Sequence, residues 1–433
     1  MRPVKKLLRT PALVAGIIGQ FTLLCCAANR PADWPQWRGP DNNGSSREGS
    51  YPVTWNSTNV LWKAALPGKG CSTPMVWKKQ IVLTAPSEGR DAVLAFDWAG
   101  KPLWQQAFGQ EQTGKHRAGS GCNPSPTTDG QSVFVYFKSG LLAALDLSGK
   151  VRWQTNLVAG FGPVNLYWDQ GTSPVLTEKA VVVARMHHGK SWLAAFDKAS
   201  GQLCWKVDRN YETPLEDDES YTTPLVLRHQ GREAVLVWGA EHVTVYDAAQ
   251  GQLIWSCGGF NPRGVTHWPS VASPVLAGEL VIVPAGRADR GQPRFEALRL
   301  GGEGDVSATH RVWKREDVGT YVPTPAEHNK RIYLLRDSGE MLCLDAATGQ
   351  TVWRGAFPKA SASFYASPVI AGGRLYVARD DGIVFVAPIE GEFHVLAQND
   401  MGERVIASPV PVANRLLIRG EKHLFCVESS PAH

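Results

Sequence analysis

The sequence predicts an all-β fold, an eight-bladed β-propeller of four-stranded antiparallel blades. Composition and two repeated signals lead to this prediction. The 433 residues include 43 Gly, 29 Pro and 16 Trp beside many short Val-rich runs, a pattern typical of short strands joined by tight turns. Length alone would allow two or three domains, so the repeats decide the fold class.

The first repeat is a Ser/Thr-Pro step followed by a β-branched run. It occurs eight times, at spacings of 41 to 52 residues, with its prolines at Pro74, Pro126, Pro174, Pro224, Pro274, Pro325, Pro368 and Pro409. A period of this length with strand-like patterning is typical of propeller blades, each too small to bury both of its faces alone.

The second repeat is an Asp and a Gly followed by Trp, later in the same interval. The aspartate can accept hydrogen bonds from turn amides, the glycine can adopt positive φ, and the tryptophan falls on the next strand, so the motif predicts a hairpin. The fifth unit keeps only Trp313 after a longer loop, and the seventh keeps Gly391 without a tryptophan. The complete copies are Asp97/Gly100/Trp104, Asp146/Gly149/Trp153, Asp197/Gly201/Trp205, Asp247/Gly251/Trp255 and Asp345/Gly349/Trp353. We expect these tryptophans to lie on outer strands, wedged between neighbouring blades.

The third unit shows the expected blade in detail, with strands over 173–177, 180–186, 191–197 and 202–208. It also contains Gly189-Lys190-Ser191, which resembles part of a phosphate-binding loop. Such a loop needs a further glycine where this chain has Ala184, and it must open a helix. The tripeptide is therefore predicted to be the loop between the second and third strands.

The ends of the repeat region predict how the ring closes. The eighth unit ends its third strand near Cys426, and too few residues follow it for a fourth strand. Before the first Ser/Thr-Pro step, the segment 59–66 carries the unmatched Trp62. We expect this segment to complete the eighth blade, so that no sheet edge stays open.

The amino terminus predicts export. Residues 1–28 combine a basic start, an apolar stretch from Leu13 to Leu24 and a small-residue cleavage site at 26–28. A membrane anchor and lipidation at Cys25 or Cys26 are the alternatives. The predicted organisation is a signal peptide over 1–28, an extension over 29–58 and the propeller over 59–433. A periplasmic or extracellular location follows, with any membrane association indirect.

Charge and cysteine content exclude several classes of function. Removal of the four basic signal residues lowers Lys+Arg from 45 to 41 against 40 Asp+Glu, so the net charge falls from +5 to about +1. A basic surface for nucleic acid is not predicted, and the protein is expected to be monomeric.

The sequence has no Cys-x-x-Cys pair, which argues against a zinc knuckle. Cys71 and Cys122, before the first strands of adjacent blades, leave a disulfide open, whereas Cys343 and Cys426 are predicted to be buried thiols.

At the Asp…Gly-x-x-x-Trp repeats the chain resembles the PQQ-repeat propellers, which include quinoprotein alcohol dehydrogenases and the envelope lipoprotein BamB. The resemblance covers about 59–428, and the segment from Asp33 to Pro40 is similar to the mature start of many exported propellers. Membership of the dehydrogenase branch would imply a pyrroloquinoline quinone with calcium and a vicinal disulfide over it. No adjacent cysteines remain after residue 28.

The candidate binding surface is the face that holds the interblade loops and the loops between second and third strands. Aromatic and charged residues are frequent there, and four arginines occupy one repeated position at second-strand ends. These features predict a funnel that binds a small anion or a sugar, with guanidinium groups holding the anion and aromatic faces stacking on a ring. Local ion pairs and solvent exposure are the alternative for the arginines. The predicted ligand-binding residues are Arg185, Arg336, Arg379, Arg419, Trp168, Tyr221, His267, Trp268 and Tyr365.

Other groups of residues give weaker indications of a functional site. His187-His188 is expected to be a loop pair, and the acidic run 216–219 lacks the spacing of a calcium loop. No nucleophile motif of a hydrolase occurs. The sequence therefore favours a non-enzymatic binding or scaffolding module with no predicted catalytic, metal or cofactor residues. The alternatives are a quinone-dependent alcohol or sugar dehydrogenase and an assembly factor for outer-membrane proteins that binds an envelope protein. Three or more oxygen ligands beneath a flat aromatic floor in the funnel would favour the enzyme.

Overall fold

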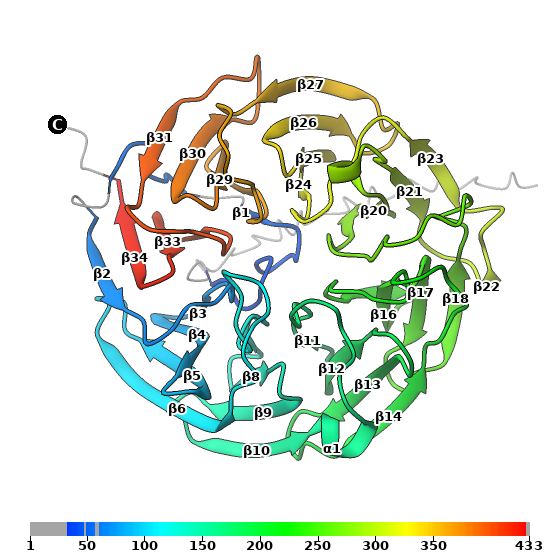
Figure 1. The fold of residues 1–433 in the computed structure, drawn as a ribbon, viewed down its shortest axis with the longest axis horizontal. Coiled ribbons are helices and arrows are strands. Elements are labelled where there is room, and N and C mark those ends of the chain that lie inside the picture. Colours follow the sequence, from blue (N-terminus) through cyan, green and yellow to red (C-terminus); the bar gives the residue numbers. More distant parts are fainter. Residues whose placement is uncertain (1–32, 47–48, 57–59, 430–433) are drawn as a thin grey trace, which may run out of the picture. The chain divides into compact units, whose positions relative to one another are not determined.

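The structure, a computed structural model, describes residues 33–46, 49–56 and 60–429. Over these residues eight antiparallel sheets form a ring, which confirms the eight-bladed propeller (Figure 1). The predicted signal peptide lies outside the described residues, and so does residue 59, the predicted start of the closing strand. Within the described ranges, none of the helices combines the length and apolar character needed to cross a membrane.

Blades 1 to 4 follow one another along the chain. Blade 1 contains β3 (Met75–Trp77), β4 (Gln80–Ser87), β5 (Arg90–Phe96) and β6 (Pro102–Gln110). Blade 2 contains β7 (Thr127–Thr128), β8 (Ser132–Tyr136), β9 (Leu141–Asp146) and β10 (Val151–Asn156), followed by helix α1 (Leu157–Phe161). Blade 3 contains β11 (Val175–Leu176), β12 (Ala180–Arg185), β13 (Trp192–Asp197) and β14 (Leu203–Asp208). Blade 4 contains β15 (Leu225–His229), β16 (Arg232–Gly239), β17 (His242–Asp247) and β18 (Leu253–Cys257).

Blades 5 to 8 complete the ring. Blade 5 contains β19 (Val275–Ala277), β20 (Leu280–Pro284), a short 3-10 helix (Ala288–Arg290), β21 (Phe295–Arg299) and β23 (Arg311–Arg315). Blade 6 contains β24 (Ala326–His328), β25 (Arg331–Leu335), β26 (Glu340–Asp345) and β27 (Thr351–Ala356). Blade 7 contains β28 (Val369–Ala371), β29 (Arg374–Ala378), β30 (Ile383–Pro388) and β31 (Ala397–Asp400). Blade 8 contains β32 (Val410–Val412), β33 (Arg415–Arg419), β34 (His423–Glu428) and β2 (Trp62–Ala65).

Strand β2 closes the ring as predicted. It pairs antiparallel with β34, with Trp62 opposite Cys426 and Ala65 opposite His423. The first and last parts of the repeat region therefore share one sheet, visible where the blue and red strands meet in Figure 1. This pairing leaves no outer strand missing from blade 8.

The repeated tryptophans join each blade to the next. Trp205 of blade 3 donates its Nε1–H to the Ala248 carbonyl of blade 4 at 3.0 Å. Its ring packs against Gly251, where a Cβ would lie 2.6 Å from the indole. Because Gly251 also has a φ of +72°, only glycine suits the position on both counts. The same indole-to-carbonyl bond is made by Trp62, Trp104, Trp153, Trp313 and Trp353.

In the fifth and seventh units, which depart from the repeat, other segments of the chain complete the packing. The long loop of blade 5 contributes β22 (Gly304–Asp305), which adds to blade 4 in parallel beside β18 and helps to bury Trp255. Blade 7 lacks a tryptophan of its own. Trp55 from the amino-terminal extension takes a place in the core cluster between blades 7 and 8, and its N–H donates to Asn399 at 2.7 Å.

The ring has two unlike faces. The hairpin face holds the turns between first and second strands and between third and fourth strands. The loop face holds the turns between second and third strands, including the Gly189-Lys190-Ser191 loop between β12 and β13, as predicted. It also holds the interblade connections 66–74, 111–126, 157–174, 209–224, 258–274, 316–325, 357–368 and 401–409.

Residues 33–46 cross the hairpin face of the ring. Trp34 forms a bridge with Val76 of blade 1, and β1 (Ser45–Ser46) pairs in parallel with β28 of blade 7. Between these two anchors the chain passes beneath the centre of the ring, because it is tied to the inner strands on both sides. It therefore closes the channel from the hairpin face.

Candidate functional site

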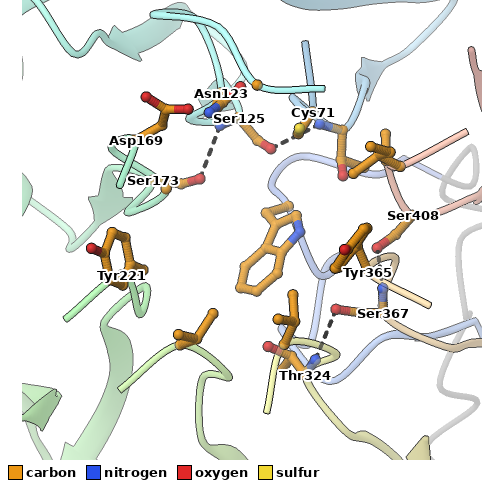
Figure 2. A pocket seen from close by; sticks show the side chains of 18 of the residues that line it. Cys71, Asn123, Ser125, Asp169, Ser173, Tyr221, Thr324, Tyr365, Ser367 and Ser408 are labelled. Carbon is orange, nitrogen blue, oxygen red and sulfur yellow. Dashed lines mark hydrogen bonds between the residues drawn. The ribbon is translucent and has the colours of Figure 1, made fainter. Parts of the chain in front are cut away.

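A cavity of about 390 Å³ lies at the centre of the ring and opens on the loop face. We call it the central cavity. Its wall is built from residues at or just before the Ser/Thr-Pro steps, which place it where the sequence predicted a funnel. Figure 2 shows side chains from all around the ring converging on this space. The lining residues used below are Trp37, Cys71, Thr73, His116, Asn123, Ser125, Trp168, Asp169, Ser173, Tyr221, Thr223, Tyr321, Thr324, Tyr365, Ser367 and Ser408.

A belt of hydroxyl groups surrounds the cavity. Each comes from the Ser or Thr of a Ser/Thr-Pro step, and each except Thr73 accepts a hydrogen bond from the backbone N–H of the equivalent residue in the preceding blade. We call this belt the hydroxyl collar. Its members are Thr73, Ser125, Ser173, Thr223, Ser273, Thr324, Ser367 and Ser408, of which Ser273 alone is not part of the cavity lining.

The collar is regular except at the junction between blades 8 and 1. Its N–H to oxygen distances lie between 2.9 and 3.1 Å. Figure 2 shows bonds of the collar, among them those from Ser125 to Ser173 and from Thr324 to Ser367. At the junction, the Thr73 hydroxyl is buried and has no hydrogen-bond partner among the described residues. The collar is thus an open chain of bonds with its ends at the place where the ring is closed. Since the collar oxygens act as acceptors, their hydroxyl protons remain available to donate.

Aromatic side chains form the wall above the collar. His116 contacts Trp168 and Tyr365 edge-on, with ring centroids 6.0 and 5.6 Å apart. His116 belongs to the connection 111–126, which reaches across the mouth of the cavity because Arg117 forms an ion pair of 2.7 Å with Asp380 of blade 7. Burial lowers the pKa of His116 from its ordinary value, which favours the neutral imidazole.

Asp169 is the one carboxylate among the described residues that line the cavity. One of its oxygens accepts from Lys138 Nζ at 2.8 Å and from the Lys115 N–H at 2.7 Å. The other accepts from the His116 N–H at 2.9 Å. The charge and the lone pairs of this carboxylate are therefore already used to hold the connection 111–126 in place.

The floor of the cavity comes from the amino-terminal segment. Trp37 is part of the cavity lining, and Arg38 beside it is fully buried. The Arg38 guanidinium donates to the carbonyls of Pro325 and Pro368 at 3.0 and 3.1 Å, which fixes the segment to blades 6 and 7. Burial without a carboxylate partner lowers the pKa of Arg38 to about 9.

A second hollow of about 630 Å³ lies on the loop face beside the central cavity. We call it the side depression. Trp168 and Tyr321 line both spaces and form the wall between them. Arg287 lies over the ring of Tyr321, 3.8 Å from its centroid. The remaining lining residues are Tyr167, His188, Leu215, Glu216, Glu219, His267 and Arg290.

The structure brings three of the five predicted aromatic residues together at the central cavity. Trp168, Tyr221 and Tyr365 line the central cavity, and Figure 2 places Tyr221 and Tyr365 on opposite sides of it. His267 lies in the side depression, where it pairs with Glu216 at 2.5 Å. Trp268 lies outside both hollows, beneath the guanidinium of Arg294. Ligand binding by these residues stays a prediction.

The four arginines occupy the predicted strand position but do not ring the funnel, which corrects the expected placement. Arg185 is buried between the rings of Tyr136 and Trp192. Arg419 is buried between blades 8 and 1 and donates to the Ser72 carbonyl at 2.8 Å. The reason is geometric. Side chains stand perpendicular to a sheet, and in this ring the sheet faces point toward neighbouring blades, not toward the central axis.

The other two arginines form local pairs, as the alternative interpretation expected. Arg379 pairs with Asp381 at 2.9 Å and lies over Phe385. Arg336 pairs with Glu340 at 2.7 Å.

The remaining predicted groupings stay apart. Cys71 and Cys122 are free thiols in separate surroundings, and Cys343 and Cys426 are buried, the last two as expected. His188 pairs with Asp218 at 3.0 Å, whereas the side chain of His187 contacts the Asn165 N–H. Within the described ranges, no three His, Cys, Asp or Glu side chains are grouped as a metal site would require.

Sequence reasoning missed the collar and the floor. The Ser/Thr-Pro step indicates the start of a strand, and its eightfold repetition also places one hydroxyl group per blade at the centre of the ring. Trp37 lies before the repeats, so no periodicity pointed to it.

The fold and the central cavity define an eight-bladed propeller with an aromatic, hydroxyl-rich funnel. The sequence model of the family described as outer membrane protein assembly factor BamB matches residues 51–221, 89–324 and 302–392. The chain belongs to this PQQ-repeat family.

Two named relatives carry the same description. The assembly factor BamB of Yersinia pestis is 24% identical over 355 residues, which cover 79% of this chain and 80% of the relative. BamB of Bordetella pertussis is 23% identical over 306 residues, which cover 67% of this chain and 68% of the relative.

Solved structures support the fold alone. BamB of Moraxella catarrhalis superposes with a TM-score of 0.61 at 15% identity, covering 87% of this chain and 98% of the other. A quinohemoprotein alcohol dehydrogenase of Pseudomonas putida superposes with a TM-score of 0.65 at 11% identity, covering 93% and 82%. The same architecture therefore carries both an assembly factor and a redox enzyme.

Proposed function

We propose that this protein is a non-enzymatic binding module of the cell envelope whose loop face docks a protein partner. The observation that carries the proposal is a cluster of exposed apolar side chains beside the side depression. Tyr167, Trp168 and Leu215 are 59%, 42% and 62% exposed, and all three line that hollow. Exposed aromatic and aliphatic side chains gathered around a concavity are typical of protein interfaces.

The rest of the surface offers a useful contrast. Leu103, Leu203 and Leu253 are also about half exposed, but each lies singly on the outer strand of a different blade. Scattered apolar residues of that kind are normal on soluble proteins. The loop face differs because its exposed residues come from two consecutive interblade connections and meet at one hollow.

The comparisons support a partner in the envelope. The two named relatives are described as assembly factors for outer membrane proteins, and the matched region spans most of this chain. The predicted signal peptide agrees with export, although it lies outside the described residues. A protein partner of the outer-membrane assembly apparatus is therefore the class that we expect on the loop face.

A quinone-dependent dehydrogenase is the second candidate, because a solved structure of that class shares the fold. Trp37 supplies the flat aromatic floor that such a cofactor would need. Calcium, however, takes six to eight oxygen ligands. Asp169 is engaged with Lys138 and backbone N–H groups, and the Asn123 amide oxygen accepts from the Ser120 N–H at 2.9 Å. These residues do not fit a calcium-bound quinone, which supports the binding function.

Site-specific photo-crosslinking in the producing cells tests the proposal. A photoreactive residue is placed at Trp168 or Leu215, with Leu103 and Leu253 as controls of similar exposure on the outer strands. We expect both loop-face positions, and neither control, to form an adduct with the same envelope protein. Equal labelling at all four positions, or adducts only at the controls, would overturn the loop face as the docking surface.

A further inference from the structure

Beyond the docking of a partner, we infer that the central cavity is a separate site for an uncharged sugar ring. The cavity of about 390 Å³ falls within the range of small-molecule sites, about 300–1,000 Å³. It is closed below by the segment that carries Trp37, so it is a pocket and not a channel. Three features of its lining decide the class of ligand.

The first feature is the arrangement of the aromatic rings. Trp37 lines the cavity from the amino-terminal segment that forms its floor. Tyr221 and Tyr365 lie on opposite sides of the space (Figure 2). The C–H bonds of one face of a pyranose ring form an apolar surface that packs on such rings, while its hydroxyl groups point outward. Aromatic groups below and at two sides match the shape of a ring better than that of an extended chain.

The second feature is the hydroxyl collar. Seven of its members line the cavity. In the described structure the oxygens of all of them except Thr73 accept from backbone N–H groups, while their protons have no acceptor assigned. The collar residues are at least nine-tenths buried, so solvent outside the cavity does not reach these hydroxyl groups. A ligand with oxygen atoms around its circumference supplies the acceptors that the collar lacks.

The third feature is the charge of the lining, which separates a sugar from an anion. Two of the four predicted arginines are buried between blades and the other two form local ion pairs, and no Lys or Arg is found among the described lining residues. The single carboxylate, Asp169, is balanced by Lys138. An anionic ligand would leave its own charge unpaired in this pocket, whereas a neutral sugar leaves none.

The inference is tested by saturation-transfer NMR on the full-length mature protein. The probes are free glucose, galactose, mannose and N-acetylglucosamine, with glucuronate and galacturonate as charged counterparts. An array of neutral and acidic glycans is probed in parallel, which distinguishes a free sugar from a terminal residue of a polymer. We expect signals from at least one neutral sugar or neutral glycan. We do not expect the uronates to be the only sugars that give signals.

Variants locate the binding. Tyr365→Ala removes one stacking face and should weaken binding by about tenfold, whereas Tyr365→Phe, which keeps the ring, should retain most of it. Tyr167→Ala is the matched control, because Tyr167 lies in the side depression and not in the cavity. Far-ultraviolet circular dichroism of each variant checks that the fold is kept.

Three results would overturn the inference. They are the absence of any neutral-sugar signal, binding confined to uronates, and neutral binding that Tyr365→Ala leaves unchanged. None of them bears on the crosslinking experiment, since a partner can dock on the loop face with the cavity empty or filled.

Discussion

The two faces of the ring are built on different principles. On the hairpin face one set of contacts recurs from blade to blade: an indole against a glycine, an indole N–H on a carbonyl, and an aspartate that accepts turn amides. On the loop face each interblade connection has its own length and chemistry. The repeated contacts of the hairpin face hold neighbouring blades together. The varied interblade connections of the loop face supply a surface that can bind a ligand or a partner.

The comparison is tested most strongly by removing one tryptophan from each face. Trp205→Ala deletes a buried indole, its bond to Ala248 and its contact with Gly251, so we expect a loss of about 3–5 kcal/mol in the free energy of unfolding. Trp168→Ala removes a ring that is 42% exposed and should change stability by about 0.5 kcal/mol or less. Urea unfolding followed by circular dichroism measures both.

Similar losses in the free energy of unfolding for the two variants would contradict this difference between the two faces. A large loss in Trp168→Ala would mean that the loop face contributes to holding the ring together. Gly251→Ala serves as a second probe of the Trp205 contact, with Gly231→Ala as its control. Gly231 also has positive φ, +78°, but a Cβ there would meet nothing within 4 Å.

A smaller effect is expected in the hydroxyl collar, which lies between the two faces. The Thr324 hydroxyl accepts from the Ser273 N–H at 2.9 Å, so Thr324→Val leaves a buried donor unpaired and should cost roughly 1–3 kcal/mol. The Thr73 hydroxyl is buried without a partner in the described structure, so the isosteric Thr73→Val should be neutral or slightly stabilising. Thermal unfolding of the two variants makes the comparison, and equal losses would show that the collar is also bonded at the junction of blades 8 and 1.

These contacts explain which parts of the structure the sequence could predict. The Asp, Gly and Trp of the hairpins act within one blade and its neighbour, so their spacing reveals both the strands and the closure through Trp62. The sequence predicts the arginine positions along the chain correctly. The direction of their side chains depends on how neighbouring sheets face one another, and the local spacing of residues carries no information about that. Trp37 lies in a segment that Arg38 fixes to carbonyls of blades 6 and 7, through contacts that span 287 and 330 residues of chain.

The smallest expected effect compares one aspartate from each face by its response to pH. On the hairpin face, hydrogen bonds from the Ser200 hydroxyl and N–H lower the pKa of Asp197 below its ordinary value of 3.8. On the loop face, burial and the neighbouring Glu241 carboxyl raise the pKa of Asp217 to about 8. Asn261 Nδ2 lies 2.8 Å from Asp217 and 2.7 Å from Glu241, and so holds the two acids together.

The signs of the two effects are opposite. Folded Asp217 holds its proton more tightly than the unfolded chain does, so its contribution to stability falls as the pH rises from about 4 to 8. Folded Asp197 holds its proton less tightly, and its contribution is lost only as the pH falls below about 4. The unfolding free energy of the wild type minus that of Asp217→Asn should therefore decline between pH 4 and 8, while the same difference for Asp197→Asn stays level there. A level difference for Asp217→Asn would show that Asp217 does not hold its proton more tightly in the folded protein, and the loop face would then not differ from the hairpin face in this pH range.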